Sequence, residues 1–144
     1  MKKYPVSEEH ELFDLSLLDD KSGYEIIQVV REGIPYTAFE KYAGVSPFTL
    51  ADWSGFLELS ERSLHRYKKD NKSFDRMRSE RIIEIARVLK KGIEVFGDEE
   101  NFNTWMNLRI LALGGVKPRE LLDSSEGIKI LEDELIRIDY GMFG

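Results

Sequence analysis

The chain has no cysteine and only two histidines, His10 and His65, among its 144 residues. Without cysteine, the sequence excludes a disulfide framework and a thiolate metal site, and it favours a reducing, cytoplasmic location. Nucleophile-base pairs and transition-metal sites therefore lack their usual side chains. The acidic run at residues 132–134 splays its carboxylates around a helix axis, which predicts a solvated face rather than an acid/base pair. We expect no enzyme, no metal and no cofactor.

Long apolar runs are also missing. No run approaches the roughly 20 residues of a membrane span. The first residues, Met1 to Lys3, are not followed by the apolar core of a signal peptide, so we expect neither a signal peptide nor membrane association. Hydrophobic residues make up 42% of the chain, which is typical of a globular protein. At this length the chain can form one compact domain or two small ones.

The sequence also lacks the pattern of a β-strand, because no alternation of apolar and polar residues extends beyond about four positions. Apolar residues instead recur three and four positions apart, which is the spacing of an amphipathic helix. The sequence therefore predicts an all-α fold, with residues 1–20, where the pattern is weakest, as a loosely held arm. The expected helices cover residues 23–32, about 36–43, 79–96, a segment capped by Asp98, 119–122 after a turn at 113–118, and a last helix capped by Ser124 or Ser125.

Residues 47–70 have the pattern of two short amphipathic helices joined by a tight turn. Ser46 and Pro47 predict the start of the first helix, because a capping residue precedes the residue type suited to the first helical position. Residues 58–60 make the turn, although Glu58 stands where glycine is usual. Ser60 is placed to cap the second helix. This pattern indicates a helix-turn-helix that binds DNA.

The second of these helices carries the candidate DNA contacts. Its residues Leu64 and Tyr67 are expected to point inward, so its polar residues face outward, where they can meet phosphates and base edges. The candidate DNA-binding residues are Arg62, Ser63, His65, Arg66, Lys68, Lys69 and Lys72. The alternative is an ordinary helical hairpin with a solvated basic face.

The charge distribution favours the DNA-binding interpretation. The chain has a net charge of −6, but residues 61–91 contain eleven Lys or Arg and five Asp or Glu, so this segment carries +6 and the remainder −12. A basic segment on an acidic body suits a DNA-binding protein because phosphate contacts supply much of the affinity. Four of these eleven cations are interleaved with Glu80 and Glu84, and we expect them to form ion pairs along the helix surface rather than to contact DNA. They are Arg81, Arg87, Lys90 and Lys91.

The last seven residues, 138–144, place two aromatic side chains and a methionine where solvated polar residues are expected. We interpret them as a surface that binds a partner. The candidate partner-binding residues are Ile138, Tyr140, Gly141, Met142 and Phe143. The alternative is that Tyr140 and Phe143 fold back on the core of the chain itself.

Motifs along most of the chain resemble, in the same order, those of the Xre/MbcA/ParS antitoxin family. They are residues 31–35, 59–64, 95–98, Trp105, 113–115, Pro118, 121–122, Gly127 and 135–141. Where members of that family often carry a Pro-Asn turn, this chain has the apolar segment 107–112, which is compatible with a continued helix.

This resemblance implies an all-α antitoxin of a type II toxin-antitoxin system. It implies an Xre-like helical region for DNA binding and dimerisation at residues 21–97, followed by a toxin-binding domain at residues 98–144. The implied partners are operator DNA, through which the antitoxin represses its own operon, and a RES-type toxin that degrades NAD. A single recognition helix reads few base pairs, so we expect a homodimer. The alternative is a stand-alone helix-turn-helix transcriptional regulator with a C-terminal dimerisation domain.

Overall fold

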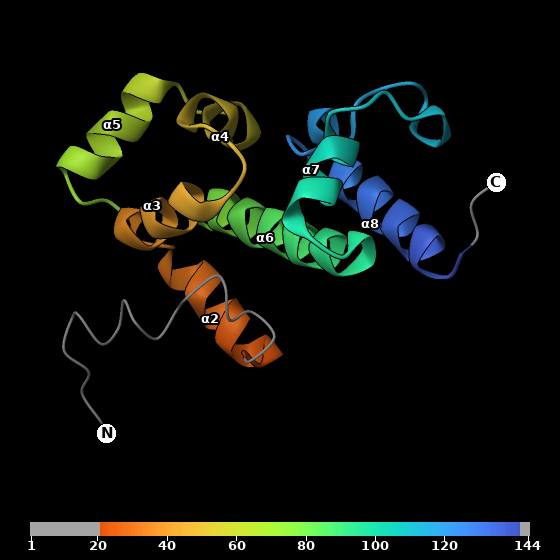
Figure 1. Ribbon diagram of the computed structural model, residues 1–144. Helices are drawn as coiled ribbons and strands as arrows, with labels where there is room; N and C mark the ends of the chain where they lie inside the picture. Colours follow the sequence, from red (N-terminus) through yellow and green to blue (C-terminus); the bar gives the residue numbers. More distant parts are fainter. Residues whose placement is uncertain (1–20, 142–144) are drawn as a thin grey trace. The chain divides into compact units, whose positions relative to one another are not determined.

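The computed structural model describes residues 21–141, which form α-helices and two short 3-10 helices without any β-strand (Figure 1). The all-α prediction is therefore confirmed. The elements are α2 (Gly23–Glu32), α3 (Tyr36–Val45), α4 (Leu50–Leu57), α5 (Glu61–Lys69), α6 (Arg76–Phe96), α7 (Glu99–Met106), η2 (Leu111–Leu113), η3 (Pro118–Leu121) and α8 (Ser125–Asp139). The predicted arm at residues 1–20 lies outside the described residues. No helix between residues 21 and 141 is both long and apolar enough to span a membrane.

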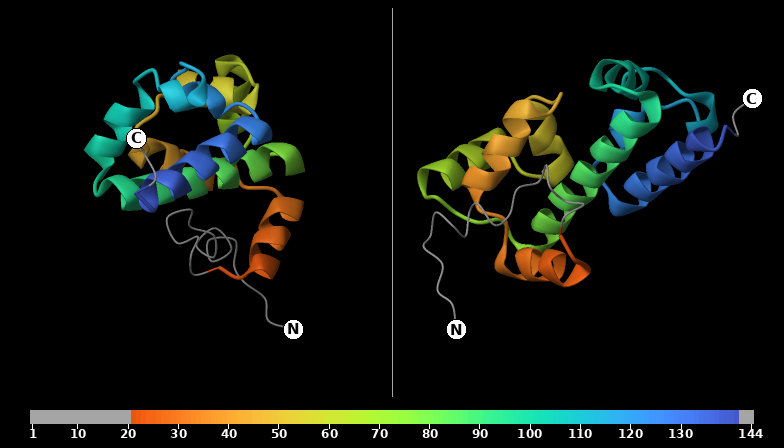
Figure 2. Two further views of the ribbon diagram at one scale, coloured as in Figure 1. Left: turned by 90° about the vertical axis from the view of Figure 1, so that its right-hand side faces the viewer. Right: turned by 60° about the horizontal axis from the view of Figure 1, so that its bottom comes forward.

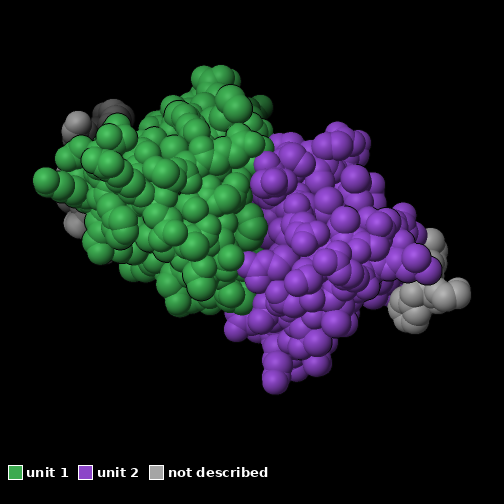
Figure 3. Space-filling model, turned by 90° about the horizontal axis from the view of Figure 1, so that it is seen from above, with its two compact units in different colours: residues 1–83 green, residues 84–144 purple. Residues whose placement is uncertain are grey.

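The chain divides into two compact units, residues 1–83 and residues 84–144 (Figure 3). The division falls inside α6, so each unit contains part of this helix. The two functional regions proposed from the sequence, residues 21–97 and 98–144, instead meet just after the end of α6.

The first unit is built around an aromatic cluster. Phe39 of α3 and Trp53 of α4 are fully buried, and their rings meet edge to face with centroids 5.3 Å apart. Phe74, in the loop before α6, packs against Phe39 at 5.1 Å. Aromatic pairs of this geometry contribute about 0.5 to 1.5 kcal/mol each beyond the burial of their area. This cluster holds α3, α4 and α5 beside the first part of α6 (Figure 2).

The core of the second unit includes an aliphatic stripe along α8. Ile128, Leu131 and Leu135 of α8 are buried on one stripe, as the spacing predicts. The 3-10 helix η3 packs on α8, where Gly127 lies so near the carbonyl of Leu121 that a β-carbon would approach it to 2.3 Å. A residue larger than glycine is therefore excluded at this contact.

Most of the predicted helix ends are confirmed. Gly33, with φ of +92°, ends α2. Asp98 caps α7 by accepting a hydrogen bond from the Asn101 amide at 2.7 Å. Ser124 caps α8 by accepting one from the Gly127 amide at 2.9 Å.

Two sequence-based expectations about helix limits are wrong. The helix expected at Ser46 and Pro47 begins at Leu50, because Thr49 and Asp52 form a reciprocal capping box there. The Ser46 hydroxyl is used elsewhere, accepting a hydrogen bond from the Trp53 indole at 3.1 Å. Residues 107–112 do not continue α7, which ends at Met106, and the chain instead forms the turn that contains η2.

The prediction of a fully solvated acidic run at residues 132–134 is also wrong. Glu134 is buried to 7% exposure and forms an ion pair with Arg137 at 2.6 Å. Glu132 is half-buried, and this burial, followed by the charges of Glu84 and Asp133, raises the pKa of its carboxyl above the usual value. The helix places residues 131, 134 and 135 on its core-facing side, so only part of the run can face water.

Candidate nucleic-acid and partner interfaces

In the turn between α4 and α5, a residue other than glycine adopts the left-handed backbone conformation. Glu58 has φ of +56° and ψ of +44°, a conformation that costs a residue with a β-carbon about 1 kcal/mol or more. The turn itself and the cap that begins α5 are as predicted. Ser60 accepts a hydrogen bond from the Ser63 amide at 3.0 Å.

Two arginines of α6 support this turn from outside. Arg78 donates from Nε to the Leu57 carbonyl at 2.8 Å and from Nη2 to the Glu58 carbonyl at 3.2 Å. Arg81 donates from Nη1 to the Phe56 carbonyl at 2.9 Å. The last carbonyls of a helix have no partner within the helix, and cations at this end are favourable for the helix dipole. These bonds therefore offset the strain at Glu58.

Sequence reasoning missed this role of the two arginines. It assigned Arg81 to ion pairs along its own helix surface and did not predict that its guanidinium donates to a carbonyl at the end of α4. The Lys91 assignment is wrong, because Lys91 pairs with Asp139 of α8 at 3.2 Å rather than with a neighbour on α6. The sequence did carry one signal of this role. Glycine is absent at position 58, and a strained turn without glycine needs stabilising contacts from another part of the chain.

Helix α5 is anchored by its apolar side, as predicted. Leu64 is fully buried, and the half-buried ring of Tyr67 stacks on Phe74 with centroids 4.9 Å apart. The opposite side of α5 is therefore turned to solvent.

The candidate DNA-binding residues do not share one environment. Arg62, His65, Arg66 and Lys69 are exposed on α5, and no ion pair within residues 21–141 involves either arginine or Lys69. The remaining three have contacts within the chain. Ser63 is half-buried beside the Ser60 hydroxyl, Lys72 lies 4.9 Å from the centre of the Tyr67 ring, and Lys68 pairs with Glu40 of α3 at 2.9 Å.

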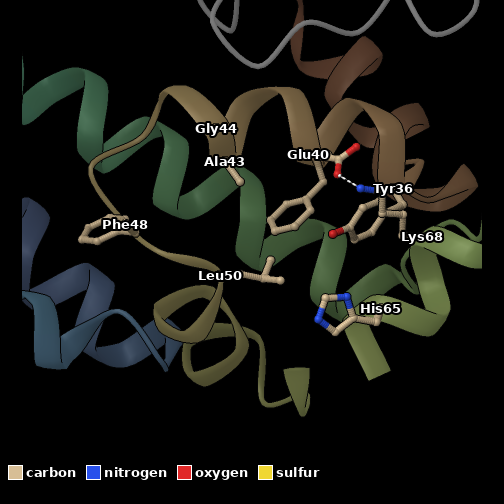
Figure 4. A pocket seen from close by; sticks show the side chains of 9 residues that line it. Tyr36, Glu40, Ala43, Gly44, Phe48, Leu50, His65 and Lys68 are labelled. Carbon is tan, nitrogen blue, oxygen red and sulfur yellow. Dashed lines mark ion pairs between the residues drawn. The ribbon is translucent and has the colours of Figure 1, made fainter. Parts of the chain in front are cut away.

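A cavity of about 340 Å³ lies in the first unit between α3, the start of α4 and α5 (Figure 4). Its walls combine aromatic and aliphatic side chains with four groups that can carry a charge or donate a hydrogen bond. The lining residues are Tyr36, Phe39, Glu40, Ala43, Gly44, Phe48, Leu50, His65 and Lys68.

The electrostatics of this cavity centre on Glu40. Its hydrogen bond and its charge raise the pKa of the Lys68 ammonium above the usual value. Burial raises the pKa of the Tyr36 hydroxyl, and the charge of Glu40 raises it further. Lys68 therefore stays cationic beside a carboxylate, and Tyr36 stays neutral.

The second candidate interface lies at the end of α8. Tyr140 is 75% exposed, so the alternative in which it folds back on the core is wrong. Ile138 is half-buried, and Ile136, one turn before Tyr140, is 45% exposed. Gly141 has φ of +71°, while the candidate residues Met142 and Phe143 lie outside the described residues. This end of α8 thus presents apolar side chains to solvent.

Two family models match successive parts of the chain. Residues 25–87 match the model of the antitoxin Xre-like helix-turn-helix domain, and residues 91–141 match that of the antitoxin Xre/MbcA/ParS C-terminal toxin-binding domain. The first match contains α4, α5 and most of α6. The second contains α7, α8 and the exposed Tyr140.

Three curated proteins are similar to the chain. Antitoxin Xre of Photorhabdus laumondii is 29% identical over 84% of this chain and 82% of its own length. Antitoxin Xre of Yersinia enterocolitica is 33% identical over 59% of this chain and 58% of its own length. A protein of Sphingobium sp. named Prs ADP-ribosylating antitoxin is 24% identical over 85% of this chain and 82% of its own length. From the two domain matches and these relatives, we conclude that the chain belongs to the Xre/MbcA/ParS family of antitoxins, which are not catalytic.

Proposed function

We propose that this antitoxin binds and inhibits a RES-type toxin that degrades NAD, and that it represses its own operon as a homodimer through α5. The toxin-binding part is supported by the apolar end of α8, which lies within the segment matched by the toxin-binding domain. The DNA-binding part is supported by Arg62, Arg66 and Lys69 on the outer side of α5, which form no ion pair within the described part of the chain. Two copies would place two recognition helices about one DNA turn apart, roughly 34 Å.

The observation that carries the DNA-binding part is the contrast between the two sides of α5. Leu64 and Tyr67 fix the inner side, so Arg62 and Arg66 project outward, and no acid within residues 21–141 pairs with either of them. Replacing both arginines with glutamate should abolish binding to the DNA fragment upstream of the gene, and circular dichroism should show unchanged helix content. Mobility shift at several salt concentrations measures the binding, because phosphate contacts weaken as salt rises.

A control variant makes the same type of charge reversal at one position away from this helix. Arg31 lies at the exposed end of α2, and Arg31→Glu should leave DNA binding close to that of the unmodified chain. If the Arg62 and Arg66 variant still bound the fragment, or if binding did not weaken with salt, α5 would not be the recognition helix.

The toxin-binding part is tested by truncation after Asp139. This cut removes residues 140–144 but keeps the pair between Lys91 and Asp139 at the end of α8. An aromatic anchor at an interface commonly contributes about 2 kcal/mol or more, so loss of Tyr140 and Phe143 should weaken the toxin complex roughly 10³-fold. The truncated chain should still fold and bind DNA. Full protection of cells that express the toxin by this variant would instead place the inhibitory surface on α8 itself.

The Sphingobium relative offers a second candidate for the partner, since its name includes ADP-ribosylation. An assay of the purified partner toxin with NAD distinguishes the two reactions. Loss of NAD alone indicates NAD degradation, and transfer of ADP-ribose to a protein indicates ADP-ribosylation. If no toxin co-purifies with the antitoxin, the alternative of a stand-alone helix-turn-helix regulator would replace the proposed function.

A further inference from the structure

Lys68 differs from the other cations at the end of α5 because it already has an anionic partner. Its ammonium lies 2.9 Å from the Glu40 carboxylate of α3, with the two side chains 60% and 46% exposed. Figure 4 shows this ion pair beside Tyr36, at the cavity between α3 and α5. Lys69, the next residue, is exposed and has no such pair within residues 21–141.

The pair contributes little to the stability of the fold. Exposed ion pairs stabilise a fold only weakly, because water screens the charges and two long side chains lose freedom. The core of the first unit already fixes α3 and α5, since Phe39 of α3 and Leu64 of α5 are both fully buried. The effect of Glu40 should therefore be found in the charge of the α5 surface rather than in folding.

We propose that Glu40 is an intramolecular competitor of DNA phosphate for Lys68. This inference rests on the proposed DNA-binding function of α5. A phosphate that approaches Lys68 must displace the Glu40 carboxylate and then lie near a second negative charge. The other titratable groups that face the cavity, Tyr36 and His65, supply no further anion, because Tyr36 stays neutral.

This arrangement removes one sequence-independent contact from DNA binding. Each phosphate that a protein neutralises adds about 0.9 to the slope of log affinity against log salt. One such contact corresponds to about a five- to eightfold difference in affinity at about 0.1 M salt. Because phosphate contacts carry no sequence information, Glu40 lowers the affinity for every DNA sequence, and less antitoxin is retained on unrelated DNA.

The experiment measures DNA affinity against salt for a set of full-length variants. The probes are the fragment upstream of the gene and a duplex of random sequence. Glu40→Gln should bind both probes about five- to eightfold more tightly at about 0.1 M salt, with a slope steeper by about 0.9. Lys68→Met should change affinity less than about twofold, because Lys68 makes no phosphate contact while it is paired. Adding Glu40→Gln to Lys68→Met should leave the slope unchanged.

The control is Glu32→Gln, which makes the same charge change on the exposed end of α2. It should leave both affinity and slope close to those of the unmodified chain. The inference is overturned if Glu40→Gln does not steepen the slope, if it does so equally without Lys68, or if Lys68→Met alone loses a full phosphate contact. In those cases the Arg62 and Arg66 variant still decides whether α5 binds DNA. An unmodified chain that binds neither probe would overturn both proposals.

Discussion

Gly92, about one turn before the end of α6, provides a sharp test of the packing in the second unit. A β-carbon at this position would lie 2.1 Å from two ring atoms of Phe102, whereas ordinary contacts of β-carbons begin at 3.4 Å. The ring would have to move by about 1.3 Å. Phe102 is 1% exposed and its ring lies against those of Phe96 and Trp105, with centroids 5.8 and 6.1 Å away. The ring therefore has little room to move.

The magnitude follows from two opposing effects. Overpacking a core typically costs about 1 to 3 kcal/mol, and this overlap belongs at the upper end. Alanine gains about 1 kcal/mol over glycine in a helix interior. Gly92→Ala should therefore destabilise the protein by about 2 kcal/mol, which lowers the melting temperature by roughly 8 to 16 °C for a unit of this size.

The assay is thermal unfolding followed by circular dichroism and by tryptophan fluorescence, with Gly55→Ala as the matched control. Gly55 lies in α4, and a β-carbon there would meet nothing within 4 Å. Gly55→Ala should leave the melting temperature unchanged or raise it. If Gly92→Ala were as stable as Gly55→Ala, the close packing of α6 against α7 would be refuted.

Three further predictions concern stability. Trp105→Ala should cost about 1 to 3 kcal/mol, below the 3 to 5 of a fully buried indole, because Trp105 is half-buried; urea unfolding measures the loss. Arg78→Met should lower the melting temperature, and additional Glu58→Gly should restore part of the loss by relieving the left-handed turn. Glu132→Gln should stabilise the protein at neutral pH. Since folding raises the pKa of Glu132, the stabilisation from its protonated state is lost as pH rises through the folded-state pKa. The melting temperatures of the two proteins should therefore converge below pH 4.5, the ordinary pKa of a glutamate carboxyl.

The sequence predicted the helices well because their ends carry local signals. Asp98, Ser124 and Gly33 act through residues within four positions of themselves, so a sequence reader can find them. Ser46 shows the limit of such signals. Thr49 with Asp52 supplies a second capping pair three residues later, and only tertiary contact with Trp53 decides how Ser46 is used.

The candidate sites were predicted less completely, because pairing between distant residues has no local signature. Residue type and helical spacing placed Arg62 and Arg66 on an exposed face. Nothing in the same spacing distinguishes Lys68 from Lys69, since the acid that pairs with Lys68 lies 28 positions earlier, on α3. The same limit hid the function of Arg78 and Arg81, whose acceptors belong to α4.

The arginine contacts at the end of α4 mean that the helix-turn-helix is not a portable module. Arg78 and Arg81 reach back 20 to 25 residues to the carbonyls that close the turn. A peptide of residues 47–70 would lack these donors and also Phe74, against which Tyr67 stacks. Transfer of the DNA-reading hairpin to another scaffold would therefore need a graft that extends through Arg81, and the hairpin should acquire its final geometry only after α6 has docked.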